Sequence, residues 1–234
     1  IFARDQVSWQ GAFVFTEDVA RQSDDYQSLR PKKQVDVLGN AELVYGTSQF
    51  QDHSIQLQAA GDGLSVAGGK DFIFDEDFTI EAWIRLADPE LGPQTLFTNR
   101  LSTAYGPGDW FIQNIDAADN GYLQFGVNGI APKTSDEKIY ADQWYHIALV
   151  RQTGQMTLYV DGVNNNASTA AAMPLGTADS NTIRVGLLGT TNQMIGNVDE
   201  IRVSNQARYT SDFAVPTVPF VNDINTVLLI HGKE

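Results

Sequence analysis

The sequence contains no cysteine, which excludes disulfide bonds, zinc–thiolate sites and cysteine catalysis. It is also poor in basic residues, with 15 Lys and Arg against 29 Asp and Glu, so the net charge is −14. Phosphate backbones and anionic lipid surfaces would repel such a chain, and no apolar run reaches membrane-spanning length. We therefore expect neither nucleic acid nor membrane insertion. The surplus carboxylates leave possible ligands for calcium.

Sustained helical periodicity is absent too, and short alternating runs separated by Gly, Asn, Asp and Pro take its place. Hydrophobic residues make up 42 % of the 234 residues, enough for a core without disulfides. With no linker or internal repeat, residues 1–234 are predicted to form one all-β domain, a two-sheet antiparallel sandwich or a barrel. Strands are predicted at 12–16, 42–45, 54–59, 63–66, 78–86, 94–98, 109–114, 121–127, 144–151, 156–161, 182–187, 197–203 and 226–231, and short helical turns at 17–23 or 204–209.

The stretch WYHIALVRQTGQMTLYVDGV, residues 144–163, has the pattern of a β-hairpin. With Thr153 and Gly154 at the turn, Leu149 pairs with Leu158. One face then carries only apolar side chains and must be buried. The other face is a mixed surface on which His146 opposes Asp161, and a structural cross-strand pair is favoured there over a catalytic dyad.

Four segments resemble a known family when taken in order: SQFQDHSIQLQAAGDGLSV, FTIEAWIRL, WYHIALVRQTGQMTLYVDGV and IGNVDEIRVSNQARYTSDF. They are similar to the laminin G-like branch of the concanavalin A-like lectin/glucanase superfamily, over residues 35–213. The resemblance implies a jelly-roll sandwich, with calcium sites in many members. Residues 214–234 then form an extended C-terminal segment that ends in the apolar strand TVLLIH.

The tail ARYTSDFAVPTVPFVNDINTVLLIHG resembles laminin G-like modules of bacteriophage tail and virion proteins. This resemblance implies a virion protein whose partners are further copies of itself or other virion proteins. It also implies that the chain is a segment of a longer protein or that its last strand completes a sheet. Closure within the chain is favoured over donation of that strand to a neighbour.

Catalytic patterns are missing from the sequence. Hydrolases of the resembled superfamily carry paired carboxylates along one strand, whereas Asp199 and Glu200 are adjacent and point to opposite faces. The carboxylates of FDEDFTIE sit mostly where a strand begins, and none of the three histidines has a nucleophile motif nearby. We therefore predict that the protein is not an enzyme.

Candidate calcium ligands are Asp199, on an otherwise apolar strand face, and Asp62, in the AAGDGL turn. The alternative for Asp199 is a carboxylate that accepts hydrogen bonds from backbone amides or an arginine. Asp116, Asp119 and Asn120 in NIDAADNG fail the alternating spacing of a calcium loop, and a hairpin turn is favoured there.

Candidate glycan-binding residues are Tyr105, Asp109 and Trp110, in the Gly- and Pro-rich loop STAYGPGDW. Sugar sites combine an aromatic platform with planar polar groups, and loops on a rigid sandwich often carry binding. The alternatives are that Trp110 packs inward at the start of a strand and that Tyr105 is an ordinary exposed aromatic. Trp83 lies opposite Ile80 and Ile84, where it packs, lines a concave surface or meets a neighbouring subunit.

These observations predict a non-enzymatic module of a virion, a phage tail fibre or capsid appendage that recognises host surface glycans. The alternative is a secreted or cell-surface bacterial carbohydrate-binding or adhesion module, because the same fold serves both.

Overall fold

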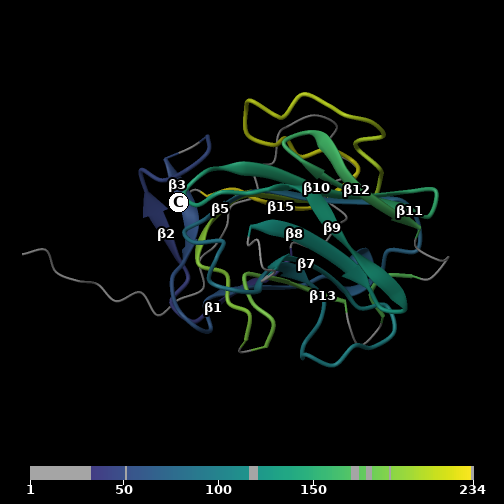
Figure 1. Cartoon of the computed structure of the whole chain (residues 1–234), viewed down its shortest axis with the longest axis horizontal. Coiled ribbons are helices and arrows are strands. Elements are labelled where there is room, and N and C mark those ends of the chain that lie inside the picture. Colours follow the sequence, from purple (N-terminus) through teal and green to yellow (C-terminus); the bar gives the residue numbers. More distant parts are fainter. Residues whose placement is uncertain are drawn as a thin grey trace, which may run out of the picture.

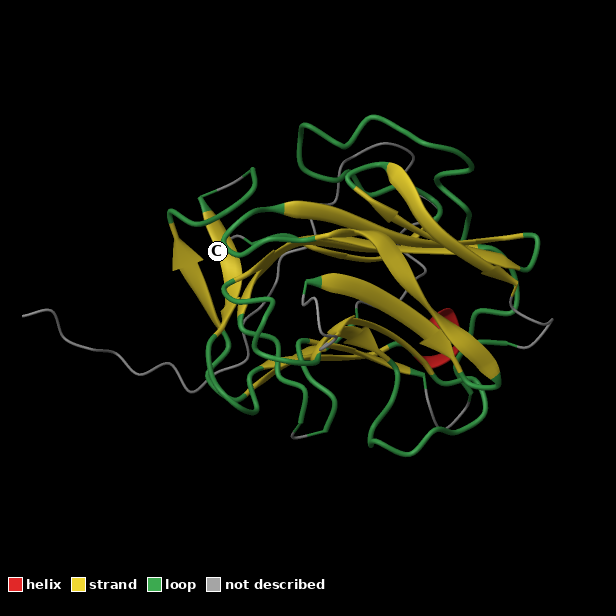
Figure 2. Cartoon of the chain, viewed as in Figure 1, coloured by secondary structure: helices red, strands yellow, loops and turns green. Residues whose placement is uncertain are grey.

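The computed structural model describes residues 33–50, 52–115, 121–169, 174–177, 181–189 and 191–232. The strand predicted at 12–16, the helical turn at 17–23 and the loop residues Asp116, Asp119 and Asn120 lie outside this part of the chain. The described residues are almost entirely strands and loops, with one short 3-10 helix, η2 (Gly69–Phe72), drawn red in Figure 2. None of the described helical structure is long and apolar enough to traverse a lipid bilayer.

The strands form two antiparallel sheets, as the sandwich prediction requires. One sheet has the order β1-β4-β13-β6-β7-β8-β9, and the other has the order β12-β11-β10-β5-β14-β3-β2 with β15 also paired to β14. The strands are β1 (Val35–Leu38), β2 (Glu42–Tyr45), β3 (His53–Leu57), β4 (Gly63–Ala67), β5 (Phe78–Leu86), β6 (Gln94–Thr98), β7 (Trp110–Ile115), β8 (Tyr122–Val127), β9 (Ile130–Lys138), β10 (Tyr145–Gln152), β11 (Gln155–Val160), β12 (Val163–Thr169), β13 (Thr182–Val185), β14 (Gly196–Ser204) and β15 (Thr226–Ile230).

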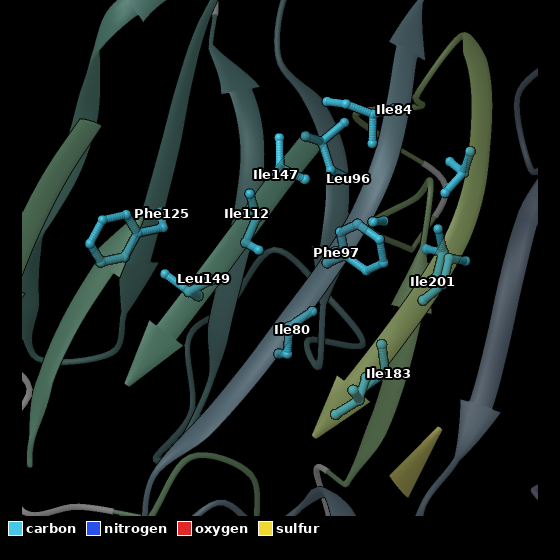
Figure 3. Packing of buried hydrophobic residues seen from close by; sticks show 14 of the residues in the cluster. Ile80, Ile84, Leu96, Phe97, Ile112, Phe125, Ile147, Leu149, Ile183 and Ile201 are labelled. Carbon is cyan, nitrogen blue, oxygen red and sulfur yellow. The ribbon is translucent and has the colours of Figure 1, made fainter. Parts of the chain in front are cut away.

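The hydrophobic core lies between the two sheets. Figure 3 shows aliphatic and aromatic side chains from both layers meeting there, among them Ile80 and Leu149 from one sheet and Ile112 and Phe125 from the other. All four are at most 2 % exposed. Apolar burial on this scale is the main stabilising contribution to such a domain.

The β10–β11 hairpin has the predicted register. Leu149 pairs with Leu158 and Ile147 with Val160, and all four side chains lie in the core. The turn residues Thr153 and Gly154 both have positive φ, 47° and 86°, as a two-residue turn matched to the strand twist requires.

The outer face of this hairpin, mixed in composition as predicted, is largely buried rather than open to solvent. We call residues 205–224 the covering segment; they cross the outside of the eight-stranded sheet without regular structure, as the yellow loops over β10 and β11 in Figure 1. The segment includes 204–209, where a helical turn was predicted and none forms. Its aromatic side chains Tyr209 and Phe213 pack on the buried residues Ala148, Val150 and Tyr159. A long irregular segment has no hydrophobic periodicity, so the sequence alone does not show which face of the sheet it covers.

The apolar C-terminal strand is inserted into the chain's own sheet. β15 pairs antiparallel with β14, Ile201 opposite Ile230, as closure within the chain requires of this strand. Its residues are buried on both faces: Leu228 and Ile230 lie in the central core, whereas Leu229 packs with Trp83 and Phe220. Trp83 therefore packs under the covering segment and does not line an open surface.

Candidate functional site

The loop between β6 and β7 carries the predicted glycan-binding residues, but it does not expose all of them. Trp110 begins β7 and is 1 % exposed in the central core, as the inward-packing alternative predicts. Asp109 is also buried, and its Oδ2 accepts a hydrogen bond from the backbone N–H of Gly106 at 2.7 Å. The prediction that Trp110 forms a sugar platform is therefore wrong, because its ring lies in the core between the sheets. Asp109 instead stabilises the conformation of the loop.

Tyr105 is the aromatic residue that this loop presents to solvent, with 48 % of the residue exposed. The guanidinium of Arg100 stacks on the ring, 3.7 Å from its centroid, and Arg100 Nη2 donates to the carbonyl oxygen of Thr103. Burial raises the pKa of the Tyr105 hydroxyl, with the Asp109 carboxylate adding to this effect and Arg100 opposing it. The ring is thus held in place by a cation–π contact and keeps exposed area on which a sugar ring can stack.

An open polar cleft of about 610 Å³ lies at one end of the eight-stranded sheet. Three short stretches line it: the residues before β5, the β10–β11 turn and the start of the covering segment. Nearly all its side chains are polar or charged, and the lining residues are Asp75, Glu76, Asp77, Arg151, Gln152, Thr153, Gly154, Asn205, Gln206 and Ala207. Such a surface offers hydrogen-bond donors and acceptors to a ligand.

The Tyr105 loop and this cleft lie at the same end of the sandwich. Gly176 N–H donates to the carbonyl of Gly108 in the loop, and the neighbouring Leu175 exchanges two backbone hydrogen bonds with Phe74. The Phe74 carbonyl in turn accepts from Nη1 of Arg151, which lines the cleft, at 3.2 Å. A short series of hydrogen bonds, the last of them from the Arg151 side chain, therefore joins the two features.

The two predicted calcium ligands are not brought together. Asp62 accepts hydrogen bonds from the backbone N–H groups of Asn40, Gln58 and Ala59, beyond the end of β3. Burial raises the pKa of Asp62, but these three donors outweigh it and the net shift is downward. Asp199 lies near the other end of β3 and shares none of these partners. Within the described residues no group of three His, Asp or Glu side chains is arranged to hold a metal ion.

Asp199 has the environment of the hydrogen-bonded alternative. It is fully buried and accepts from the backbone N–H groups of Gln49, Glu200 and Gly232 at 2.9 to 3.2 Å. Burial nevertheless raises its pKa to about 6, and the neighbouring Glu200 adds to the shift. The stability contributed by protonated Asp199 is therefore complete below pH 3.8 and is lost as the pH rises through about 6. A bound cation would favour the ionised form instead, and calcium at Asp199 stays a prediction.

A buried polar network lies beneath the covering segment. Glu81 on β5 is 0 % exposed and accepts hydrogen bonds from Arg202 Nε at 2.8 Å and from the Tyr209 hydroxyl at 2.7 Å. Its third partner is Nε2 of His146 at 3.2 Å. Burial raises the pKa of Glu81, but His146 and Arg202 outweigh it and hold the pKa below the ordinary value. The network fixes the covering segment to the sheet.

The hairpin pattern predicted a cross-strand pair between His146 and Asp161, but the His146 ring does not pair with that carboxylate. The Asp161 carboxylate accepts from the backbone N–H of His146, while the imidazole turns to Glu81. Rings of Trp83, Tyr209, Phe213 and Phe220 surround the imidazole at 5.4 to 6.2 Å between centroids. His146 is therefore a structural residue, as the sequence predicted, but with a different partner.

The comparison with protein families decides which superfamily this sandwich belongs to. A family model described as concanavalin A-like lectin/glucanases superfamily, Laminin_G_3, matches residues 58–212. The chain belongs to this superfamily. No functionally curated protein matches it.

Solved structures with the same fold come from proteins of different roles. A Bacteroides ovatus protein that is proposed to bind carbohydrate aligns with a TM-score of 0.52 and 16 % identity, over 87 % of this chain and 52 % of that one. The binding domain of Paraclostridial Mosquitocidal Protein 1 gives a TM-score of 0.58 and 20 % identity, over 75 % and 44 %. Trypanosoma rangeli sialidase gives a TM-score of 0.55 and 19 % identity, over 75 % of this chain and 27 % of that one. This chain thus spans about half or less of each matched protein, and at these identities the likeness shows the superfamily fold alone.

The catalytic carboxylate pattern of the superfamily's hydrolases has no counterpart in the described sheets. Asp199 and Glu200 are both fully buried, with a shift of strand register after Asp199. Glu200 accepts from the Phe220 N–H at 2.6 Å and lies 2.7 Å from Nδ1 of His231. Protein groups therefore satisfy both carboxylates, and neither faces an open cleft.

Two features of the site escaped sequence analysis. In the sequence, Asp75, Glu76 and Asp77 are carboxylates where a strand begins and Arg151 is a residue of the hairpin, with nothing to place them together. They meet because β5 pairs with β10, Phe78 opposite Arg151, and the first residues of the covering segment complete the cleft. The sequence does show the cluster of carboxylates where β5 begins, but the pairing of β5 with β10 that brings it to the turn comes from the structure.

Proposed function

We propose that this chain is a non-enzymatic module of a virion, a phage tail fibre or capsid appendage, which recognises glycans on the host surface. The observation that carries glycan recognition is the half-exposed ring of Tyr105, stacked on Arg100 at the end of a rigid sandwich. The lectin-type fold and the polar cleft at the same end support it. The resemblance of the ARYT-containing tail to virion modules supports the virion assignment.

The absence of catalysis is part of the proposal. The buried carboxylates Glu81, Asp199 and Glu200 are held by protein donors beneath other parts of the chain. A general acid must reach the glycosidic oxygen, and these groups do not reach solvent. The accessible carboxylates Asp75, Glu76 and Asp77 are consecutive residues before β5 and lack the superfamily's spacing along one strand. The alternative role, a secreted or cell-surface carbohydrate-binding module, is supported by the Bacteroides ovatus match.

Glycan recognition is tested by a glycan-array screen of the purified chain, with calcium and with EDTA. We expect specific binding that Tyr105→Ala weakens by about 3- to 10-fold, the range expected for one aromatic contact. Tyr105→Phe keeps the ring and should bind like the original chain. Dependence on calcium, abolished in Asp199→Asn, would support the metal site. An array without any bound glycan would contradict glycan recognition.

The virion assignment is tested by immunogold electron microscopy of the native source with antibodies against this chain. We expect the label on regular particles, at a tail or on the capsid surface. Label on the surface of bacterial cells that carry no particles would instead support the adhesion module.

A further inference from the structure

We propose that the cleft formed by residues 75–77, 151–154 and 205–207 binds an uncharged sugar unit of the recognised glycan. This inference rests on the proposed glycan recognition and adds to it a second site and a ligand class. Tyr105 provides stacking, whereas the cleft provides hydrogen bonds.

The walls of the cleft are fixed by contacts within the chain. Asp77 Oδ1 accepts from the Thr153 N–H at 2.7 Å, which ties the start of β5 to the hairpin turn. The backbone carbonyl of Gln206 accepts a hydrogen bond from the Thr79 hydroxyl at 2.8 Å. Oε1 of Gln206 accepts a second one from Nδ2 of Asn225 at 3.0 Å. A cleft held in this way is preorganised, so binding requires little ordering of the walls.

Arg151 is the feature that indicates a ligand. It is only 4 % exposed, yet it forms no ion pair with any carboxylate in the described part of the chain. Its Nη1 donates to the carbonyls of Phe74 and Glu76 at 3.2 and 3.3 Å, and its Nε has no partner among the described residues. Nε is covered by protein atoms, but Arg151 lines the cleft, and because buried charges are normally paired its guanidinium still favours an acceptor there.

The carboxylates around the cleft decide the charge of the ligand. Asp75 and Glu76 are exposed and Asp77 is half-buried, so three acidic groups surround the single cation. An anionic sugar such as a sialic or uronic acid would satisfy Arg151 but be repelled by these groups, in a chain of net charge −14. An ammonium group would satisfy the carboxylates but offer Arg151 no acceptor. A neutral sugar hydroxyl both donates and accepts, and it suits both partners.

The geometry also links the two sites to one ligand. The Tyr105 loop is connected to the cleft by the Gly176 to Gly108 hydrogen bond, the Leu175–Phe74 pair and the bond from the Arg151 side chain to Phe74. An oligosaccharide with one unit on Tyr105 and another in the cleft would join two weak contacts into a tighter one.

The test compares the chain with the double variant Asp75→Ala/Glu76→Ala on arrays of neutral, sialylated, uronic-acid and glucosamine-terminated glycans. Both side chains are exposed, so the fold is expected to persist, and a melting curve checks this. The matched control is Asp136→Asn, an exposed carboxylate on β9. We expect preference for neutral glycans, at least about tenfold weaker neutral binding in the double variant, and relatively stronger binding of anionic glycans. The control should bind like the original chain.

The outcomes separate this inference from glycan recognition itself. Preference for sialylated, uronic-acid or glucosamine-terminated glycans would overturn the ligand class and leave glycan recognition standing. Neutral binding that the double variant does not change, but Tyr105→Ala weakens, would overturn the cleft alone. Binding of no glycan at all would overturn both.

Discussion

Replacing Glu81 by alanine is expected to lower the free energy of unfolding by about 3–5 kcal/mol, the range for removing one partner of a buried ion pair. The substitution leaves Arg202, His146 and the Tyr209 hydroxyl without their common acceptor. The guanidinium of Arg202 would keep the Phe220 ring, 4.2 Å from its centroid, and a 3.5 Å contact with the Val221 carbonyl, but no carboxylate partner among the described residues. Urea denaturation of both proteins measures the difference.

Two controls accompany this experiment. Glu90→Ala removes an exposed carboxylate and is expected to change stability by less than about 0.5 kcal/mol. Glu81→Gln keeps an acceptor but not the charge, and it should fall between the two. A loss below about 1 kcal/mol for Glu81→Ala would show that the network does not hold the covering segment.

The pH dependence of the same transition has a defined sign. Because the folded-state pKa of Glu81 lies below 4.5, its contribution is complete above that pH and is lost as the pH falls through the folded-state pKa. The effect of Glu81→Ala should therefore shrink in acid. Arg208 and Asp223 form a second, half-buried ion pair, within the covering segment itself. The hydrogen bonds from Arg208 lower the pKa of Asp223 to about 2.

The strands of the core were predictable because they are short apolar or alternating runs bounded by turn residues. The boundaries of β5 and β6 match the predicted 78–86 and 94–98, and the register of β10 with β11 follows from its alternation. Three strands were missed: β1, β9 and β12. β9 reads IAPKTSDEK and β12 reads VNNNAST, and both lie at sheet edges, where polar residues and proline replace the apolar pattern.

The candidate site was less predictable because it depends on contacts distant in sequence. The sequence offered Tyr105, Asp109 and Trp110 as neighbours, but strand geometry sends Trp110 into the core and leaves Tyr105 outside. The partner of His146 was predicted from the hairpin alone, whereas Glu81 comes from the adjacent strand β5. Loop paths such as that of the covering segment are set by tertiary packing, which no local pattern encodes.

Ending the chain at Asn225 is expected to abolish the soluble monomer, because it removes β15 from the centre of the molecule. The deletion takes Leu228 and Ile230 from the core and uncovers Trp83 and Phe220. It also removes His231 from Glu200, and Gly232 from Asp199. Two buried carboxylates would then lose partners while part of the β14 edge becomes unpaired, and exposed edges of this kind aggregate.

The truncation is measured by size-exclusion chromatography of the soluble fraction, beside a chain that ends at Gly232. The longer chain keeps every described contact of β15 and should elute like the full sequence. A truncated chain that stays monomeric but no longer assembles would mean that the strand's main role is to pair with a neighbour. Closure within the chain predicts instead that the truncated chain loses its fold and is absent from the monomer peak. The reason is that β15 hydrogen-bonds to β14 and is buried on both faces within the same domain.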